Sequence, residues 1–468
     1  MRFTRLSRPI LGAGISCLVS CALVSCADDP GDSALPPEEQ TDAALPVERD
    51  ASTATDATDA GAEEKDASRI YPSFDASAPP IDCKSDPCAV SLTTRGFFGY
   101  WETPLGRVIA RGVGASFCAL LRDGTVACWG ANDAGQLGRG EDASSWGSPT
   151  AMRVPGLAKI AQLDGTCAVD DAGAAWCWSY GPYQNLSSSP VNSLERSPVR
   201  LALDPVKKVA VGSFGVSSVT GCAIGEDGGV VCWGANTNAI VSATNVTGNS
   251  VVPVTPIALP PGGRARDIAV GAAAVVLMED GSLLSWGDNP TLGRGTSITP
   301  NPYPQKIDIA GIASSADVRV SEGCATAWGA AYCWGAGAST TTLHPITYYY
   351  LDNLERARPS PLVLPEPVRQ ISASGARQGC VVGESGSVYC WGDNTYGQLG
   401  DGTKTYAAAP VKVGGLPAAA VEVRAAGDAT CALLVSGKIY CWGADQYGQL
   451  GNGSLYEPSL VPQEVTLP

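Results

Sequence analysis

The amino-acid sequence predicts an all-β, seven-bladed β-propeller, and three observations carry that prediction. A phrase recurs in which two Cys flank a turn marked by Gly and the second Cys is followed by Trp-Gly. The Trp residues that end the copies stand 48 to 57 residues apart, a period typical of propellers and solenoids. Helical periodicity of useful length is absent after the N-terminal segment. The seven copies end at Trp129, Trp178, Trp233, Trp286, Trp334, Trp391 and Trp442.

Each repeat contains four short runs with the character of strands. In the last full repeat they cover residues 411–413, 421–425, 430–434 and 438–442, separated by Gly and Pro. In the two strands that carry the cysteines, both faces are apolar, as a sheet stacked between other sheets requires. Residues 457–468 begin a repeat that then stops, and residues 107–121 supply its continuation. We therefore expect a closed ring whose last blade combines strands from both termini.

The cysteines within a copy predict disulfides across a hairpin. A three-residue loop such as 122–124, with Gly last, sets the two Cys directly opposite each other. One copy has lost both partners together, with Val275 and Ser285 in their places. A buried unbonded Cys is the alternative, and zinc is disfavoured by the spacing and by the single His. The predicted disulfides are Cys83–Cys88, Cys118–Cys128, Cys167–Cys177, Cys222–Cys232, Cys324–Cys333, Cys380–Cys390 and Cys431–Cys441, and they imply an oxidising compartment.

The N-terminus has the layout of a secretory signal. Three Arg precede an apolar run from residue 9 to residue 24. The following LVSC at residues 23–26 resembles the lipobox of bacterial lipoproteins, which implies lipidation of Cys26. An overlapping LVSC leaves Cys21 as a second candidate, and an ordinary cleaved signal peptide is the alternative.

Composition divides the rest of the chain. Residues 27–80 hold 14 acidic and 3 basic residues with few large apolar ones, which predicts a disordered acidic tether. Residues 81–104 are expected to be a lead-in with a small disulfide loop, and residues 105–468 the propeller. The propeller is mildly acidic without a Lys/Arg cluster, so nucleic acid is not an expected partner.

Motif residues then indicate a family. The pattern Trp-Gly followed closely by Gly-Gln-Leu-Gly occurs at residues 129–140, 391–402 and 442–453. It resembles the repeat of the regulator-of-chromosome-condensation-1 (RCC1) superfamily, which implies a seven-bladed propeller over residues 105–468. The paired cysteines resemble its secreted bacterial branch. Repeats 2, 3 and 5 lack Gly-Gln-Leu-Gly, repeat 4 keeps only part of it, and the family's usual His-Thr is missing.

Chemistry is sparse. His344, the only His, has no nucleophile motif beside it, and no nucleotide-binding fingerprint stands in the required context. The repeats depart from their pattern at residues 179–198, 235–256 and 336–361. The last of these segments contains Tyr348, Tyr349 and Tyr350, residues suited to a binding surface.

The sequence therefore predicts a non-catalytic, monomeric cell-envelope module without cofactor or metal. It would be lipid-anchored at the outer membrane or cell surface, or released from it, and recognise a protein or polysaccharide through rim loops. A carboxylate-dependent hydrolase or lyase on the propeller face is one alternative. A guanine-nucleotide exchange-like regulator is another, and export counts against it.

Overall fold

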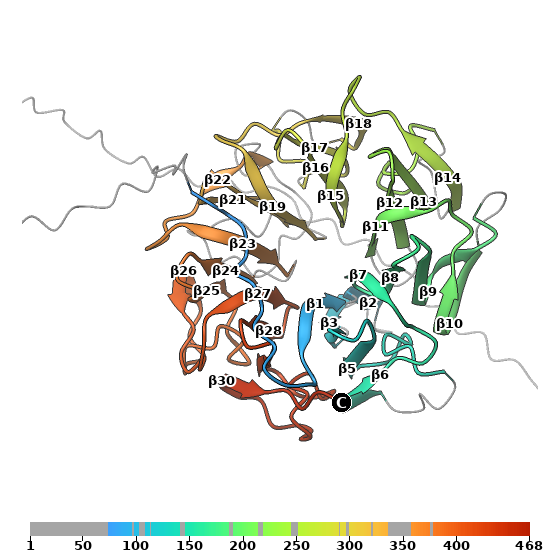
Figure 1. Cartoon of the computed structure of the whole chain (residues 1–468). Coiled ribbons are helices and arrows are strands. Elements are labelled where there is room, and N and C mark those ends of the chain that lie inside the picture. Colours follow the sequence, from blue (N-terminus) through green and yellow to red (C-terminus); the bar gives the residue numbers. More distant parts are fainter. Residues whose placement is uncertain are drawn as a thin grey trace, which may run out of the picture. The chain divides into compact units, whose positions relative to one another are not determined.

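In the computed structural model, seven four-stranded antiparallel sheets are arranged around a central channel (Figure 1). The seven-bladed propeller is thereby confirmed. The structure describes residues 74–95, 98–102, 108–112, 114–140, 146–186, 191–213, 219–244, 251–289, 291–295, 299–319, 322–335, 357–374 and 378–468. These residues form strands and turns without an α-helix, and all lie in one unit, Glu63–Pro468. Among these residues there is no helix that is long and apolar enough to cross a membrane.

The strands of each blade follow one another in sequence, from the channel outward. Blade 1 comprises β1 (Ala89–Arg95), β4 (Ser116–Leu121), β5 (Val126–Ala131) and β6 (Gly147–Arg153). Blade 2 comprises β7 (Ile160–Asp164), β8 (Cys167–Asp170), β9 (Ala175–Gln184) and β10 (Val191–Arg200). Blade 3 comprises β11 (Val206–Ser213), β12 (Val219–Gly225), β13 (Val230–Ala235) and β14 (Val251–Ile257). Blade 4 comprises β15 (Ala265–Val270), β16 (Ala273–Met278), β17 (Leu283–Gly287) and β18 (Asn301–Lys306).

The remaining blades follow the same plan. Blade 5 comprises β19 (Ala313–Val318), β20 (Glu322–Ala327), β21 (Ala330–Gly335) and β22 (Ser360–Pro361). Blade 6 comprises β23 (Val368–Ala373), β24 (Gln378–Gly383), β25 (Val388–Gly392) and β26 (Ala407–Lys412). Blade 7 comprises β27 (Ala420–Ala425), β28 (Ala429–Leu434), β29 (Ile439–Gly443) and β30 (Ser459–Glu464). A separate hairpin, β2 (Phe98–Glu102) with β3 (Val108–Gly112), is inserted between the first two strands of blade 1.

The hydrophobic core is divided among the seven contacts between neighbouring blades. Seven apolar clusters are present in the described residues, and each combines residues of two adjacent blades. The second and third strands of a blade are therefore buried on both faces, which explains why their sequences are apolar throughout rather than alternating.

The repeated Trp links five of the seven blades to the blade before it by a hydrogen bond. Trp178, at the end of the third strand of blade 2, donates its indole N–H to the carbonyl oxygen of Gln136 in the Gly-Gln-Leu-Gly segment of blade 1, at 2.7 Å. A buried indole N–H needs such an acceptor. The equivalent bonds, 2.8–3.0 Å long, join Trp286 to Ile240, Trp334 to Thr291, Trp442 to Gln398 and, across the closure of the ring, Trp129 to Gln449.

The last Gly of the same segment is required by the same Trp. A Cβ added to Gly400 would lie 2.6 Å from the indole nitrogen of Trp442, and the backbone of Gly400 has a φ of +68°. Both conditions exclude a larger residue. The two recurring motifs are thus two halves of one contact between blades. Where blade 2 lacks the segment, Trp233 Nε1 has no hydrogen-bond partner among the described residues.

The ring closes differently from the prediction. Sheet β27-β28-β29-β30 contains only C-terminal residues, so the expected mixture of strands from both termini in the last blade is wrong. The innermost strand of blade 1 is β1, which lies within the predicted lead-in 81–104. Strand β3, which the sequence assigns to that blade, pairs with β2 instead.

Packing, and not proximity in sequence, selects the innermost strand. Ala89 and Leu92 of β1 are fully buried in the cluster shared with blade 7. The Ala89 N–H donates to the carbonyl oxygen of Gly437 at 2.9 Å, the same junction bond that joins every other pair of neighbouring blades. Because the β2–β3 insertion separates β1 from β4, the apolar run nearest to the Cys strand is not its partner. The propeller therefore begins at Ala89 rather than at residue 105.

The segment before β1 crosses the turns of blades 5, 6 and 7, and we call residues 74–88 the strap (Figure 1). Arg369 of blade 6 donates to the carbonyl oxygens of Asp75 and Ser77 at 2.6 Å. The Asp82 N–H donates to Val435 of blade 7 at 2.7 Å, and Arg122 of blade 1 donates to Cys83 at 3.0 Å. Residues 74–80, which the sequence assigns to the tether, thus contact the propeller.

Replacement of Trp286 and of Trp233 by Phe separates the indole hydrogen bond from the indole's volume. Both side chains are fully buried, but only Trp286 has an acceptor, so Trp286→Phe leaves the Ile240 carbonyl unpaired. We expect Trp286→Phe to cost about 1–3 kcal/mol more unfolding free energy than Trp233→Phe. Urea unfolding followed by fluorescence measures the difference. Equal losses in the two variants would contradict the role assigned to the bond.

Candidate functional site

The central channel brings the innermost strands of all seven blades around one cavity. Its volume is about 370 Å³, and the strap closes part of its mouth through Ala76, Ala78, Pro79 and Ile81. Since alternate residues of a strand point to opposite sides, each innermost strand offers two principal positions to the channel. These positions carry polar side chains in most blades. In blades 2 to 7 they include Gln162, Asp164, Lys208, Asp267, Ser315, Asp317, Gln370, Ser372, Glu422 and Arg424.

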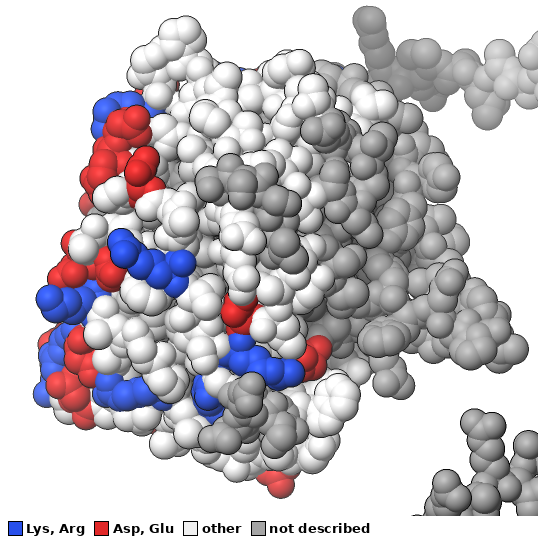
Figure 2. All heavy atoms as spheres, turned by 90° about the vertical axis from the view of Figure 1, so that its right-hand side faces the viewer, with Lys and Arg blue, Asp and Glu red and all other residues white. Residues whose placement is uncertain are grey.

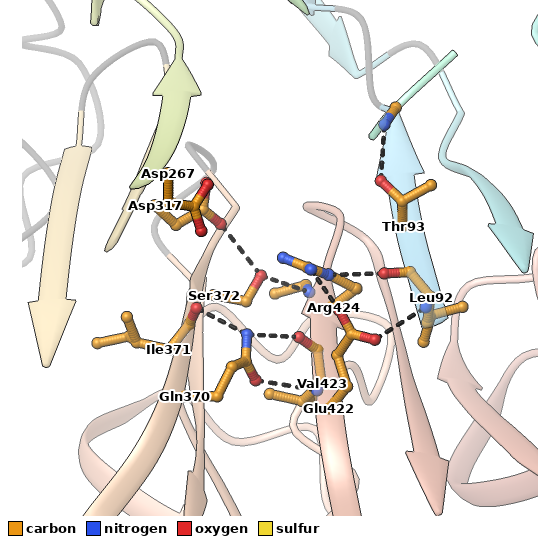
Figure 3. Close-up of polar contacts among 12 residues, drawn as sticks. Leu92, Thr93, Asp267, Asp317, Gln370, Ile371, Ser372, Glu422, Val423 and Arg424 are labelled. Carbon is orange, nitrogen blue, oxygen red and sulfur yellow. Dashed lines mark hydrogen bonds and ion pairs between the residues drawn. The ribbon is translucent and has the colours of Figure 1, made fainter. Parts of the chain in front are cut away.

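Many of these side chains bind the backbone of the following blade (Figure 3). Gln370 exchanges two hydrogen bonds with the backbone of Val423, at 3.0 and 3.2 Å. Glu422 accepts from the N–H of Leu92 at 2.8 Å and so repeats the pattern across the closure of the ring. The second position does the same through Thr93 to Gly165, Asp317 to Ala373, and Ser372 to Ala425, at 2.7–3.1 Å.

These bonds pair backbone N–H groups that the fold leaves at the edges of the innermost strands. An innermost strand is a sheet edge, and its unpaired N–H groups would otherwise face the channel. A polar side chain from the preceding blade supplies the acceptor. These residues were not predicted from the sequence. The detectable signal was a polar residue alternating with apolar ones in the strand before each Cys strand, as in residues 160–164, 206–210 and 421–425.

Most carboxylates in the channel are held by cations. Asp267 pairs with Lys208, Glu422 pairs with Arg424, and Asp317 lies 3.3 Å from Arg319. The hydrolase hypothesis requires two acidic side chains at one end of the channel, free to donate a proton and to attack or activate water. The carboxylates do share one cavity, but these three are engaged in ion pairs, and each also accepts a backbone hydrogen bond. The arrangement therefore does not favour that chemistry.

Asp164 is the exception among the carboxylates that line the cavity. It makes no side-chain hydrogen bond and no ion pair with another described residue. Burial raises its pKa, while the positive charges of Lys208, Arg319 and Arg424 act in the opposite direction.

Glu322 is a buried acid outside the channel. It is 1% exposed, lies against the Cys324–Cys333 disulfide, and one of its oxygens has no partner. Burial raises its pKa to about 8, and the charge of Asp317 adds to the effect. The three side chains are close enough to hold a metal ion, but the two sulfurs are bonded to each other.

All seven predicted cysteine pairs lie at bonding distance. The six within blades sit at directly opposed positions of the second and third strands, with Cα atoms 4.0–4.1 Å apart. The predicted lipidation sites Cys26 and Cys21 lie outside the described residues. So do His344 and the predicted binding residues Tyr348, Tyr349 and Tyr350.

The departures from the repeat collect on one face of the ring. Because each blade is an antiparallel meander, the connections of strands 1–2 and 3–4 emerge together, and we call this the loop face. The described strand ends that flank the departures at 179–198, 235–256 and 336–361 are those of third and fourth strands, and the β2–β3 hairpin lies in the connection between a first and a second strand. The opposite face, which we call the turn face, carries the short turns between the second and third strands, and the strap.

The distribution of charged side chains also distinguishes the turn face. Ion pairs occur at the turn face, including Lys159–Asp171, Lys207–Glu226 and Arg264–Glu279. In the view of Figure 2, charged side chains gather toward one side, and most of the remaining described surface is uncharged. The turn face is thus regular and charged, whereas irregular segments define the loop face.

The charge of Glu322 makes stability depend on pH. Its pKa is about 8 in the folded chain and near 4.5 when unfolded, so the folded state binds the proton more tightly. Its contribution is present below pH 4.5 and is lost as the pH rises through 8. We expect Glu322→Gln to match the parent near pH 5 and to exceed it by at least about 1 kcal/mol at pH 8.5.

Chemical unfolding at the two pH values, with the exposed Glu384→Gln as control, measures this difference. An equal effect of Glu322→Gln at both pH values would contradict the assignment.

Comparison with known proteins identifies the repeat. Two models described as the regulator of chromosome condensation (RCC1) repeat match, one at residues 385–434 and 436–468, the other at 114–136 and 368–398. The ultraviolet-B receptor UVR8 of Arabidopsis thaliana is 27% identical over 375 residues, covering 78% of this chain and 71% of the receptor. Human E3 ubiquitin-protein ligase HERC2 is 28% identical over 193 residues, 39% of this chain, and the match spans 4% of the ligase.

Solved structures agree on the fold. Human WBSCR16 superposes with a TM-score of 0.58 at 20% identity, covering 74% of this chain and 94% of its own. A chain from the structure of Kap60 bound to yeast RCC1 (Prp20) gives a TM-score of 0.57 at 19% identity, covering 73% and 83%. These matches show RCC1 repeats at residues 114–136 and 368–468 and an RCC1-like propeller fold for the chain.

Proposed function

We propose that this chain is a non-catalytic interaction module whose loop face binds a macromolecular partner. One observation carries the proposal: the strand ends that flank the long departures from the repeat, together with the inserted β2–β3 hairpin, lie at one face, while the other face has short turns and ion pairs. Irregular loops on a rigid scaffold are where binding residues collect. Ion pairs in the channel and at the turn face leave few free catalytic groups there.

The proposal extends to where the module works. The N-terminal signal pattern, Cys26 in its lipobox-like sequence and the acidic residues that follow favour display at a bacterial cell envelope on a lipid-anchored tether. Seven cysteine pairs at bonding distance favour an oxidising compartment. The partner would then be an envelope protein or polysaccharide, and the propeller would act as a monomer.

A receptor among the relatives supports an interaction role. UVR8 is named as a receptor, and the matched segment is a small part of HERC2, so neither name assigns a reaction to these repeats. The fold alone does not decide function. The proposal therefore depends on the separation of the two faces.

Affinity capture with the full oxidised chain, followed by titration of the purified partner, tests the proposal. The loop-face variant replaces Tyr348, Tyr349 and Tyr350 by Ser. The matched turn-face variant combines Lys207→Gln with Glu226→Gln, an exposed ion pair. We expect the loop-face variant to lose affinity by about tenfold or more and the turn-face variant to keep it, since removal of aromatic anchors costs above 1 kcal/mol each. Equal losses in both variants, or capture of nothing by the parent, would overturn the proposal.

A further inference from the structure

The cavity at the strap end of the channel has the size of a small-molecule site. Its volume of about 370 Å³ falls in the range of ligand pockets in proteins. It lies on the axis of the ring and is lined by every blade, so it is separate from the outer loops proposed to bind a macromolecule. It is also the place where the chain gathers most of its channel-facing charge.

Opposite charges are balanced in the cavity wall. The acidic residues are Asp164, Asp267, Asp317 and Glu422, and the basic ones are Lys208, Arg319, Arg369 and Arg424. Three ion pairs and the bonds of Arg369 to the strap account for most of them. A ligand with a single charge would meet a group of its own sign in this wall, which disfavours simple anions and simple cations alike.

Asp164 supplies an acceptor for a ligand. Its carboxylate borders the cavity and has no hydrogen bond or ion pair to another described residue. The equivalent position is Ala210 in blade 3 and Ala269 in blade 4. In the other four blades its polar side chain is engaged, because Thr93, Asp317 and Ser372 accept from the next blade's backbone N–H and Arg424 pairs with Glu422. Asp164 is partly exposed, so its carboxylate is open to a ligand, and an ammonium group could form an ion pair with it there.

Arg319 and Arg424 supply donors in the same cavity. Arg319 uses Nε toward the Ala373 carbonyl and pairs with Asp317, and Arg424 uses Nε toward the Leu92 carbonyl and Nη2 toward Glu422. Within the described part of the chain, Nη1 of each guanidinium has no hydrogen-bond partner. Guanidinium groups bind carboxylates strongly because two N–H groups match two oxygens.

We propose that the cavity binds a small zwitterion carrying one ammonium and one carboxylate group, as a free α-amino acid does. The ammonium group lies on Asp164, and the carboxylate lies between Arg319 and Arg424. The strap contributes a small apolar wall through Ala76, Ala78, Pro79 and Ile81, which suits an aliphatic side chain. This site goes beyond the proposed macromolecular binding and does not depend on it.

Three related probes test the proposal on the full oxidised chain by calorimetry. L-valine carries both charges, isobutylamine only the ammonium, and isovalerate only the carboxylate. We expect L-valine to bind in the millimolar range or tighter, and each single-charge analogue to bind at least about tenfold more weakly, a difference of about 1.4 kcal/mol.

Two variants locate the site. Asp164→Asn keeps the shape and removes the unpaired charge, so L-valine affinity should fall about tenfold or more. Asp171→Asn, at an exposed ion pair outside the cavity, should keep it. Thermal unfolding of both variants controls for folding, and Arg319→Lys provides a second test from the carboxylate side. No binding of L-valine by the parent, binding of isovalerate as tight as that of L-valine, or unchanged binding by folded Asp164→Asn would each overturn the proposal.

Discussion

The hydrogen bond from a Trp indole to a carbonyl oxygen of the preceding blade joins five of the seven pairs of neighbouring blades and fixes their relative positions. The bond joins the end of a third strand to the loop that leaves the previous third strand, so it sets both the spacing and the rotation between blades. Its copy from Trp129 to Gln449 links the two ends of the ring. The seven apolar clusters between neighbouring blades then need only small and branched side chains, and no sheet has to continue from one blade to the next.

The polar channel follows from this stacking. Once the sheets are packed face to face, each innermost strand exposes an edge, and in blades 1, 2, 3, 6 and 7 a side chain of the preceding blade accepts from that edge. Gln370 and Glu422 show that an amide and a carboxylate perform the same task. Many polar side chains of the channel are engaged in such bonds. Asp164 differs from them because it makes no side-chain hydrogen bond to a described residue.

The repeat, the disulfide pairs and the blade count could be predicted because each depends on residues close together in sequence. Cys118 and Cys128 are separated by one turn, and Trp129 follows at once. The closure could not be predicted in the same way, because Ala89 is selected by its burial against blade 7 and by the Gly437 carbonyl, more than 300 residues away. The channel site could not be predicted for a similar reason, since Asp164, Arg319 and Arg424 come from three blades and no local sequence pattern joins them.

The strap also determines how the ring responds to mechanical load. A pull applied upstream of residue 74 reaches Arg369 first, then Val435, and only afterwards the junction between Ala89 and Gly437. The load is thus shared in series by contacts on blades 6 and 7 before it acts on the point where the ring is closed. The Cys83–Cys88 loop stands between these contacts and β1 and limits how far the segment can extend. In a propeller held by its N-terminus, the strap would therefore detach before the junction between blades 1 and 7 opens.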